Sequence, residues 1–154
     1  YCTRVGSGPF PTELFDGDGE KLREIGREFG ATTGRPRRCG WLDIVALKYS
    51  VMMNGVTGLI MMKADVMNDF DTIRVATAYK VDGVETSEFP FETGGKIEPV
   101  YKDFKGWKCN INNIRRYEDF PAELKTYVEY IERETGVPVV IISVGPDREE
   151  TIVR

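Results

Sequence analysis

Apolar residues recur at helical spacing in three parts of the chain. In residues 19–29, apolar side chains three or four positions apart stand among charged ones, which predicts a short amphipathic helix. Apolar positions between residues 42 and 53 predict a second helix, which ends at Asn54-Gly55. Pro121 is expected to open a third helix, which ends at Gly136 and has an apolar face formed by Leu124, Tyr127, Val128 and Ile131.

Other segments carry the patterns of β-strands. Continuous apolar runs at residues 57–62 and 137–143 are typical of buried parallel strands. Residues 73–81 alternate, Asp82-Gly83 is a strong hairpin signal, and residues 84–89 form the returning strand. Residues 1–16 are predicted to be an extended lead-in, and residues 90–118 a set of loops and short strands. Residues 149–154 are predicted to form an edge strand. The patterns together predict a mixed α/β fold.

Composition and charge restrict the class of protein. With 154 residues, of which 41% are hydrophobic and 30% charged, the chain lies in the ordinary range of globular domains. Its net charge of -4 argues against a nucleic-acid or membrane-surface protein, because an acidic surface repels polyanions. No apolar run approaches the roughly 20 residues that a membrane-spanning helix needs.

The cysteine and histidine content adds two expectations. Cys2, Cys39 and Cys109 are an odd number of cysteines without the spacing of a zinc site, which indicates a reducing cytoplasm. Histidine is absent from the sequence, so the commonest general acid or base is missing. The chain does not begin with methionine, which suggests a piece of a longer polypeptide.

The candidate chemistry is concentrated in residues 30–43. Arg35, Arg37 and Arg38 stand within four positions, close to two threonines and between glycines. A guanidinium group pairs with a carboxylate or phosphate through two parallel hydrogen bonds, and threonine hydroxyls and backbone N–H groups satisfy further lone pairs. The loop therefore suits a small dianion. The alternative is a solvated basic turn, or arginines that are paired with the chain's own acidic residues.

Residues 30–43 read Gly-Ala-Thr-Thr-Gly-Arg-Pro-Arg-Arg-Cys-Gly-Trp-Leu-Asp, which resembles the signature loop of adenylosuccinate synthetase. This family comprises GTP-dependent ligases that join IMP to aspartate. Residues 1–13 resemble the family's segment just upstream of that loop, and residues 62–65 and 143–148 resemble two segments downstream. The resemblance runs in order from one end of the chain to the other. By this resemblance, residues 1–154 are identified as the C-terminal portion of a single synthetase domain.

Two of the resembling segments follow the two apolar strands, and ligands in open α/β sheets bind outside the carboxyl ends of the strands. Asp65 can accept hydrogen bonds from guanine N1–H and the exocyclic amine, a donor pair that adenine lacks, while the stem of Lys63 covers the ring. Backbone N–H groups of residues 143–145 can meet guanine O6. A solvent-facing Lys-x-Asp pair and a plain turn before Pro146 remain the alternatives, and Met62 stands where the usual guanine motif has asparagine.

The resemblance also implies roles for individual residues. It implies a mobile loop that closes on aspartate, formed by Ala31, Thr32, Thr33, Gly34, Arg35, Pro36 and Arg37. In the implied arrangement Arg35 also reaches IMP, Arg37 reaches GTP, and Val5 lines the IMP ribose pocket through its backbone. The guanine-binding residues that it implies are Lys63, Ala64, Asp65, Ser143, Val144 and Gly145.

For the whole chain, the resemblance implies part of a P-loop-NTPase-like, mostly parallel sheet with flanking helices and a small antiparallel hairpin region. It implies IMP, GTP and L-aspartate as substrates of a cytoplasmic homodimer, with neither nucleic acid nor membrane as a partner. The phosphate-binding loop, the catalytic aspartate and histidine, and the Mg²⁺ ligands belong to the N-terminal part of the family, which this sequence lacks. We therefore expect no catalytic or metal-binding residue in this chain.

Two other functions remain open at this point. The first is a non-catalytic module that binds guanine nucleotides or dicarboxylates through the same loops. The second is a generic α/β domain with surface arginines, for which substitution of Arg35 or Asp65 would leave nucleotide and aspartate binding unchanged.

Overall fold

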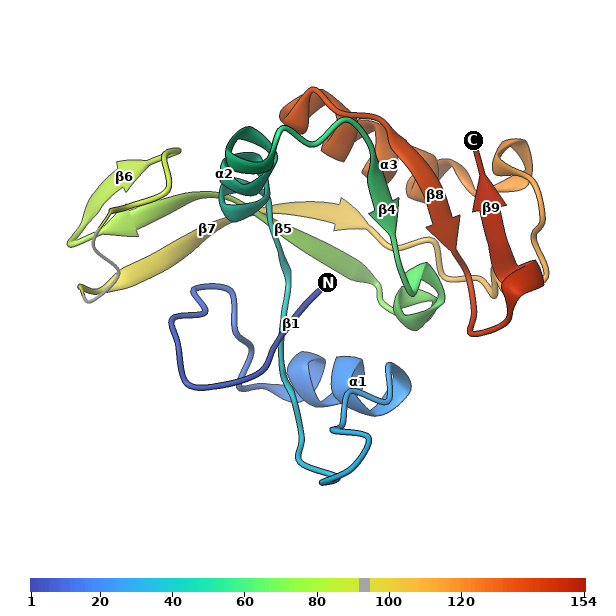
Figure 1. Ribbon diagram of the computed structural model, residues 1–154, viewed down its shortest axis with the longest axis horizontal. Coiled ribbons are helices and arrows are strands. Elements are labelled where there is room, and N and C mark those ends of the chain that lie inside the picture. Colours follow the sequence, from blue (N-terminus) through green and yellow to red (C-terminus); the bar gives the residue numbers. More distant parts are fainter. Residues whose placement is uncertain (92–94) are drawn as a thin grey trace. The chain divides into compact units, whose positions relative to one another are not determined.

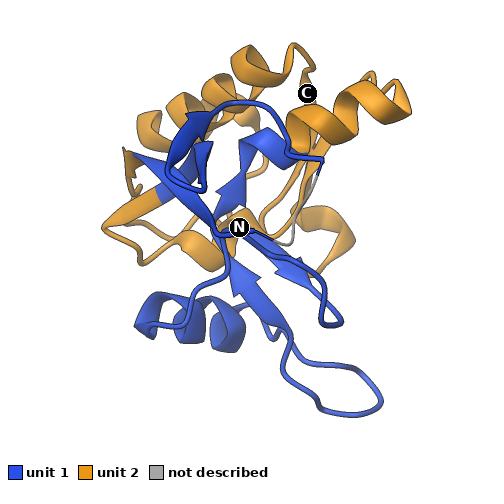
Figure 2. Ribbon diagram, turned by 90° about the vertical axis from the view of Figure 1, so that its left-hand side faces the viewer, with its two compact units in different colours: residues 1–46, 74–102 blue, residues 47–73, 103–154 orange. Residues whose placement is uncertain are grey.

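A computed structural model describes residues 1–91 and 95–154, which divide into two units (Figure 2). Unit 1 comprises residues 1–46 and 74–102, and unit 2 comprises residues 47–73 and 103–154. Helices and strands occur in both units, so the predicted mixed α/β class is confirmed. Three elements contribute residues to both units: α2 (Ile44–Asn54), β5 (Thr72–Val81) and β7 (Ile97–Lys105).

In unit 1, a two-stranded antiparallel pair lies against the first helix. β1 (Cys2–Arg4) pairs with β2 (Arg38–Gly40), which places Arg4 opposite Arg38. The helix, α1 (Gly17–Ile25), packs on β2. It begins after Asp16, whose carboxylate accepts hydrogen bonds from two backbone N–H groups of the first turn.

The predicted end of this helix, residue 29, is wrong. α1 ends at Ile25, because Arg27 adopts a left-handed φ of 50°, which a right-handed helix cannot continue. Phe29 instead forms an isolated antiparallel bridge with Pro36. The helical spacing of apolar residues continues past the point where the backbone turns.

The second sheet of unit 1 is organised around β5. β3 (Leu42–Asp43) runs parallel to β5, β6 (Val84–Thr86) runs antiparallel to it, and β7 also pairs with it. The predicted hairpin is confirmed, since Asp82 and Gly83 have φ values of 49° and 86°, the left-handed pair that a tight two-residue turn requires. Its returning strand is shorter than predicted, and the second predicted helix begins two residues late because its first residues form β3.

The nine-residue strand β7 was not predicted. Short strands and loops were expected over residues 90–118, of which residues 92–94 lie outside the described part of the chain. β7 contains Pro99 and several charged side chains, and most of its residues are only partly buried. These charges hide the alternation of apolar and polar residues by which a strand is recognised.

Asp43 and Tyr79 form a buried polar contact in unit 1. The Asp43 carboxylate accepts a hydrogen bond of 2.5 Å from the Tyr79 hydroxyl and one of 3.0 Å from the Ala46 N–H, so it also caps α2. Asp43 is 6% exposed, and this burial raises the pKa of its carboxyl above the ordinary value. Burial and the nearby carboxylate likewise raise the pKa of Tyr79.

Unit 2 is built on a three-stranded sheet with β8 (Val139–Ser143) at its centre (Figure 1). β4 (Leu59–Met61) runs parallel to β8, and β9 (Thr151–Val153) runs antiparallel on the other side. α3 (Ala122–Thr135) packs against β8 with its predicted apolar face buried, and it ends at Gly136 in a left-handed conformation. The third helix, the parallel pairing of the two apolar strands and the edge strand are therefore confirmed. The predicted burial of the first apolar strand is wrong, because Ile60 at the centre of β4 is 56% exposed. Unit 2 also holds short 3-10 helices: η1 (Ala64–Met67), η2 (Tyr117–Asp119) and η3 (Arg148–Glu150).

We predict that Tyr79→Phe lowers the free energy of unfolding by about 1–3 kcal/mol at neutral pH, because it leaves a buried carboxylate oxygen without its donor. The loss of the donor raises the pKa of Asp43 further. The penalty therefore shrinks as the pH falls through the folded-state pKa of Asp43, where the protonated carboxyl costs less to bury.

Denaturant unfolding at several pH values checks this prediction. Tyr101→Phe is the matched control, since Tyr101 is a half-buried tyrosine of the same unit for which the described residues give no hydroxyl hydrogen bond. Equal losses of unfolding free energy in the two variants, without pH dependence, would contradict the hydrogen bond between Tyr79 and Asp43.

Candidate functional site

The loop that carries the arginines is closed by its own backbone. The N–H of Gly30 donates to the Arg35 carbonyl, and the N–H of Gly34 donates to the Gly30 carbonyl, both over 2.8 Å. Gly34 has a φ of 64°, a conformation that favours glycine. Residues 31–36 are all exposed. The loop therefore presents its polar side chains to solvent from a tight backbone turn.

The three arginines of the loop have different surroundings. Arg37 Nη1 lies 2.9 Å from Glu28 Oε2, and Glu28 is only 3% exposed. Tyr1 donates its hydroxyl to the other oxygen of Glu28 over 2.7 Å. The side chain of Arg35 has no hydrogen bond or ion pair to residues 1–91 or 95–154. Arg35 is thus available to a ligand, whereas Arg37 is already oriented by a buried carboxylate.

The guanidinium of Arg38 is engaged in hydrogen bonds within the protein. It donates through Nε and Nη2 to Glu13 and through Nη1 to the carbonyl oxygens of Gly6 and Gly8. The hydrogen bond to Glu13 raises the pKa of Arg38 above its ordinary value. These bonds fix the backbone that follows Val5 against β2. The alternative that loop arginines pair with the chain's own acids therefore holds for Arg38 and in part for Arg37.

A cavity of 180 Å³ in unit 1 brings predicted residues together. Of these, Val5, Thr33, Arg35, Pro36 and Arg37 line it, and Ala31, Thr32 and Gly34 do not. The other lining residues are Arg4, Gly6, Gly30 and Arg38. Sequence reasoning placed Gly30 and Arg38 in the anion-binding loop and assigned no site role to Arg4 and Gly6. The signal for Arg4 was its position beside Val5 in the same resembling segment. The buried partner Glu28 had no sequence signal, since it is one more charged residue of the helix predicted over residues 19–29.

The predicted guanine residues meet at one edge of the sheet in unit 2. β4 and β8 are parallel neighbours, so Lys63 and Asp65 follow one strand where residues 143–145 follow the other. Lys63 has a left-handed φ of 55° and starts the turn into η1. Asp65 Oδ1 is buried and has no hydrogen-bond partner among the described residues. A buried carboxylate oxygen without a donor is unfavourable, which makes it a candidate acceptor for a ligand.

The second guanine segment is partly committed to its own turn. The Ser143 hydroxyl donates to the Gly145 carbonyl over 2.9 Å, and the Val144 N–H donates to the Glu150 carbonyl over 2.8 Å. The expectation that exposed backbone N–H groups meet guanine O6 therefore does not apply to Val144. The backbone N–H of Gly145 has no acceptor in the described part of the chain, so this group is available to meet guanine O6.

An asparagine network joins the two guanine segments. Asn112 donates to the Val144 carbonyl over 2.7 Å and accepts from Asn68 over 3.2 Å, and Asn68 in turn accepts from the Trp107 indole over 3.1 Å. The backbone N–H of Asn68 bonds to the Asp65 carbonyl. Sequence reasoning missed these residues, because their partners lie far away along the chain.

Comparison with known proteins identifies the family. The family model described as adenylosuccinate synthetase matches residues 1–152. The chain belongs to the adenylosuccinate synthetase family. It is 61% identical to the adenylosuccinate synthetase of Parabacteroides distasonis and 58% identical to that of Porphyromonas gingivalis, in each case over 154 residues. These matches cover 100% of this chain and 36% of each relative, so the chain spans about a third of the length of these synthetases.

A solved structure agrees with the family. The fully ligated adenylosuccinate synthetase from Plasmodium falciparum superimposes with a TM-score of 0.94 at 40% identity, over 100% of this chain and 38% of that one. None of the helices in residues 1–91 and 95–154 has the length and apolar character needed to cross a membrane. The same residues form no group of three or more histidine, cysteine or acidic side chains that could hold a metal ion.

The different surroundings of Arg35 and Arg37 generate a prediction about stability. Arg37→Leu should lower the free energy of unfolding by about 1–3 kcal/mol, because the buried carboxylate of Glu28 loses a charge-assisted hydrogen bond. We discount the full cost of breaking a buried pair, since the side chain of Arg37 is 37% exposed. Arg35→Leu should change stability by no more than about 0.5 kcal/mol.

Denaturant unfolding of the two variants side by side checks this difference. The two substitutions remove the same group from the same loop, so each serves as the control for the other. A larger loss for Arg35→Leu than for Arg37→Leu would refute the assigned pairing.

Proposed function

We propose that this chain supplies guanine and aspartate recognition to a GTP-dependent ligase that joins IMP and L-aspartate to form adenylosuccinate. The observation that carries the proposal is the cavity in unit 1, where Val5, Arg35 and Arg37 converge in a member of this family. Two of these residues are arginines, and guanidinium groups are the side chains best matched to carboxylate and phosphate oxygens.

In this proposal, the loop of residues 31–37 binds L-aspartate. Arg35 has no internal partner, so its two parallel N–H donors can meet a substrate carboxylate and reach IMP. Arg37 is held by Glu28 and serves both aspartate and GTP from a fixed direction. Val5 contributes its backbone to the IMP ribose. Closure of such a loop excludes water and aligns the reactants, and both effects lower the barrier to reaction.

Guanine recognition is assigned to unit 2. Asp65 would accept from guanine N1–H and the exocyclic amine, with the stem of Lys63 over the ring and the backbone of residues 143–145 toward O6. The partnerless Oδ1 of Asp65 supports this role, because a guanine donor would satisfy it. Each charge-assisted hydrogen bond of this kind is worth about 1.5–3 kcal/mol, enough to discriminate GTP from ATP by a factor of ten or more.

The chemical steps are assigned to residues outside this sequence. In the reaction that the family implies, a catalytic aspartate deprotonates IMP, and O6 of IMP then attacks the γ-phosphate of GTP. The amine of L-aspartate then displaces phosphate from the resulting 6-phosphoryl-IMP. A histidine that takes part cannot come from a sequence without histidine. Mg²⁺ would stabilise the phosphate transfer, and we assign none of its ligands to residues 1–91 or 95–154, which form no fitting group.

Further parts of the proposal come from the family. Residues 1–154 would form the C-terminal portion of one synthetase domain, as part of a P-loop-NTPase-like sheet. The protein would be a cytoplasmic homodimer that acts in purine biosynthesis, with small molecules as ligands. The expectation of a mostly parallel sheet is wrong for the strand pairs whose register is described. Of these, β3–β5 and β4–β8 are parallel, whereas β1–β2, β5–β6 and β8–β9 are antiparallel.

The test of this function compares two forms of the protein. The natural polypeptide that contains these residues, here called the full-length protein, should turn over GTP only when IMP and L-aspartate are both present. The 154-residue chain alone should show no phosphoryl transfer, because it lacks the catalytic groups. Turnover by a product with a verified mass of 17.4 kDa would refute the division of roles.

The same test separates the alternative, a non-catalytic module that binds guanine nucleotides or dicarboxylates. The module is favoured by one observation, that this chain holds both recognition segments but no histidine. Tight GDP binding by the full-length protein, without any GTP turnover, would support the non-catalytic module and refute the ligase proposal.

The guanine assignment yields a separate prediction. In the full-length protein, Asp65→Asn should raise the KM for GTP at least roughly tenfold, because an amide replaces one acceptor oxygen by a donor. Inosine triphosphate lacks the exocyclic amine, so its KM should rise much less and the preference for GTP should fall. Steady-state kinetics with both nucleotides checks this, with Asp69→Asn as the exposed control in the same unit. An unchanged preference for GTP would remove Asp65 from the guanine site.

A further inference from the structure

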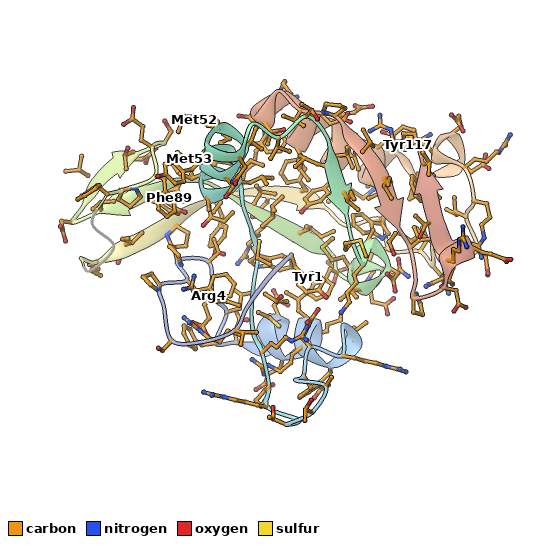
Figure 3. The ribbon with its side chains drawn as sticks, viewed as in Figure 1. Tyr1, Arg4, Met52, Met53, Phe89 and Tyr117 are labelled. Atoms are coloured by element: carbon orange, nitrogen blue, oxygen red, sulfur yellow. The ribbon has the colours of Figure 1, made fainter. Side chains whose placement is uncertain are left out.

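Arg4 occupies a position in unit 1 that is electrostatically unfavourable in the absence of a ligand. The register of β1 and β2 places Arg4 directly opposite Arg38, and like charges at opposite positions of an antiparallel pair destabilise it. Glu13 pairs with Arg38 and offsets that charge. Arg4, which is labelled in Figure 3, is exposed, and its side chain has no hydrogen bond or ion pair to the residues that the structure describes.

The charge of Arg4 is not offset by the acidic residues nearby. The carboxylate of Asp43 lines a neighbouring cavity together with Arg4, but it is taken up by the Tyr79 hydroxyl and the Ala46 N–H. Glu13 and Glu28 pair with Arg38 and Arg37. The guanidinium of Arg4 therefore stays uncompensated within the described part of unit 1.

Arg4 faces the same cavity as the residues proposed to bind substrate. It lines the cavity of 180 Å³ with Val5, Arg35 and Arg37. Two residues that line this cavity, Arg4 and Arg35, carry guanidinium groups that lack a carboxylate partner among residues 1–91 and 95–154. Two uncompensated positive charges at one cavity are matched by a ligand with two negative charges.

The backbone beside Arg4 holds its guanidinium in place. A Cβ added at Gly8 would overlap Arg4 Nη2 and lie 2.7 Å from its Cζ, so the guanidinium rests on a surface that only glycine leaves open. The carbonyl of Gly8 is itself fixed by Arg38. A side chain that is already confined loses less conformational entropy when it binds a ligand.

We propose that Arg4 binds an oxyanion of a small substrate jointly with Arg35. The inference rests on the proposed function and adds a binding residue to that site. Two sources supply such an oxyanion: a carboxylate of L-aspartate, or the phosphate of IMP. Both accept the paired N–H donors of a guanidinium, and the kinetic test distinguishes them.

Steady-state kinetics of the full-length protein tests the proposal through Arg4→Met, which keeps the length of the side chain and removes its charge. The KM for one substrate should rise at least roughly tenfold, while the other KM values stay within about twofold. A rise confined to L-aspartate identifies the carboxylate as the oxyanion, and a rise confined to IMP identifies the phosphate. Arg27→Met is the matched control, since Arg27 is an exposed arginine of unit 1 whose side chain has no described partner.

Two further variants keep the test valid if Arg4→Met fails to fold. Gly8→Ala retains the charge and displaces the guanidinium, so it should raise the same KM. Arg4→Lys should restore part of the lost affinity, because it returns the charge without the planar pair of donors. Unchanged KM values in all Arg4 and Gly8 variants would overturn the proposal. So would a parallel rise of every KM with a lowered unfolding temperature, which is the mark of a structural role.

Binding measurements separate this inference from the ligase proposal. If the full-length protein shows no turnover, calorimetric titration with L-aspartate, IMP and inorganic phosphate still measures the oxyanion site directly. Loss of binding in Arg4→Met, with retention in Arg27→Met, would uphold the site although the ligase had failed. Equal binding by wild type and Arg4→Met would overturn the oxyanion site whether or not the ligase is active.

Discussion

The structure of the arginine loop depends on two carboxylates that pair with two of its guanidinium groups. Glu28, which is 3% exposed, fixes Arg37, and Glu13 fixes Arg38. Without these partners, mutual repulsion of the arginines would oppose a tight turn around one cavity. Glu13 and Glu28 compensate the charges of Arg38 and Arg37 but not that of Arg35. The cavity beside the loop therefore stays positively charged while the loop backbone stays folded. The residues that stabilise the loop are thus different from Arg35, the residue available for the proposed anion binding.

In unit 2, the parallel pairing of β4 and β8 has a comparable effect. Parallel neighbours end at the same edge of a sheet, so segments about 80 residues apart along the chain become adjacent there. The asparagine network then links the two turns, because Asn112 holds Val144 and Asn68 holds the backbone of Asp65. The strand order brings the guanine segments together, and the side-chain amides set their spacing.

Much of the fold follows from local patterns, and the site follows from them only in part. The hairpin at Asp82-Gly83 and the helix closed by Gly136 were predictable, because each depends on residues adjacent in sequence. The end of α1 and the strand β7 were not, since a backbone turn at Gly26 and tertiary pairing overrode the pattern. The loop arginines were recognisable because they are close together in sequence. Their partners Glu13 and Glu28 became evident only in the three-dimensional structure.

The pairing of Arg37 with Glu28 also constrains how the loop can act. Glu28 accepts a hydrogen bond from Nη1 of Arg37, and a departure of Arg37 would remove this cation from a buried carboxylate. Breaking a buried pair in this way is costly, so any ligand that drew Arg37 away would lose part of its binding energy to that cost. A ligand that meets the remaining donors of the guanidinium avoids the cost. In the proposed site, Arg37 therefore acts best without moving, and movement on ligand binding is left to the side chain of Arg35, which has no described bond to break.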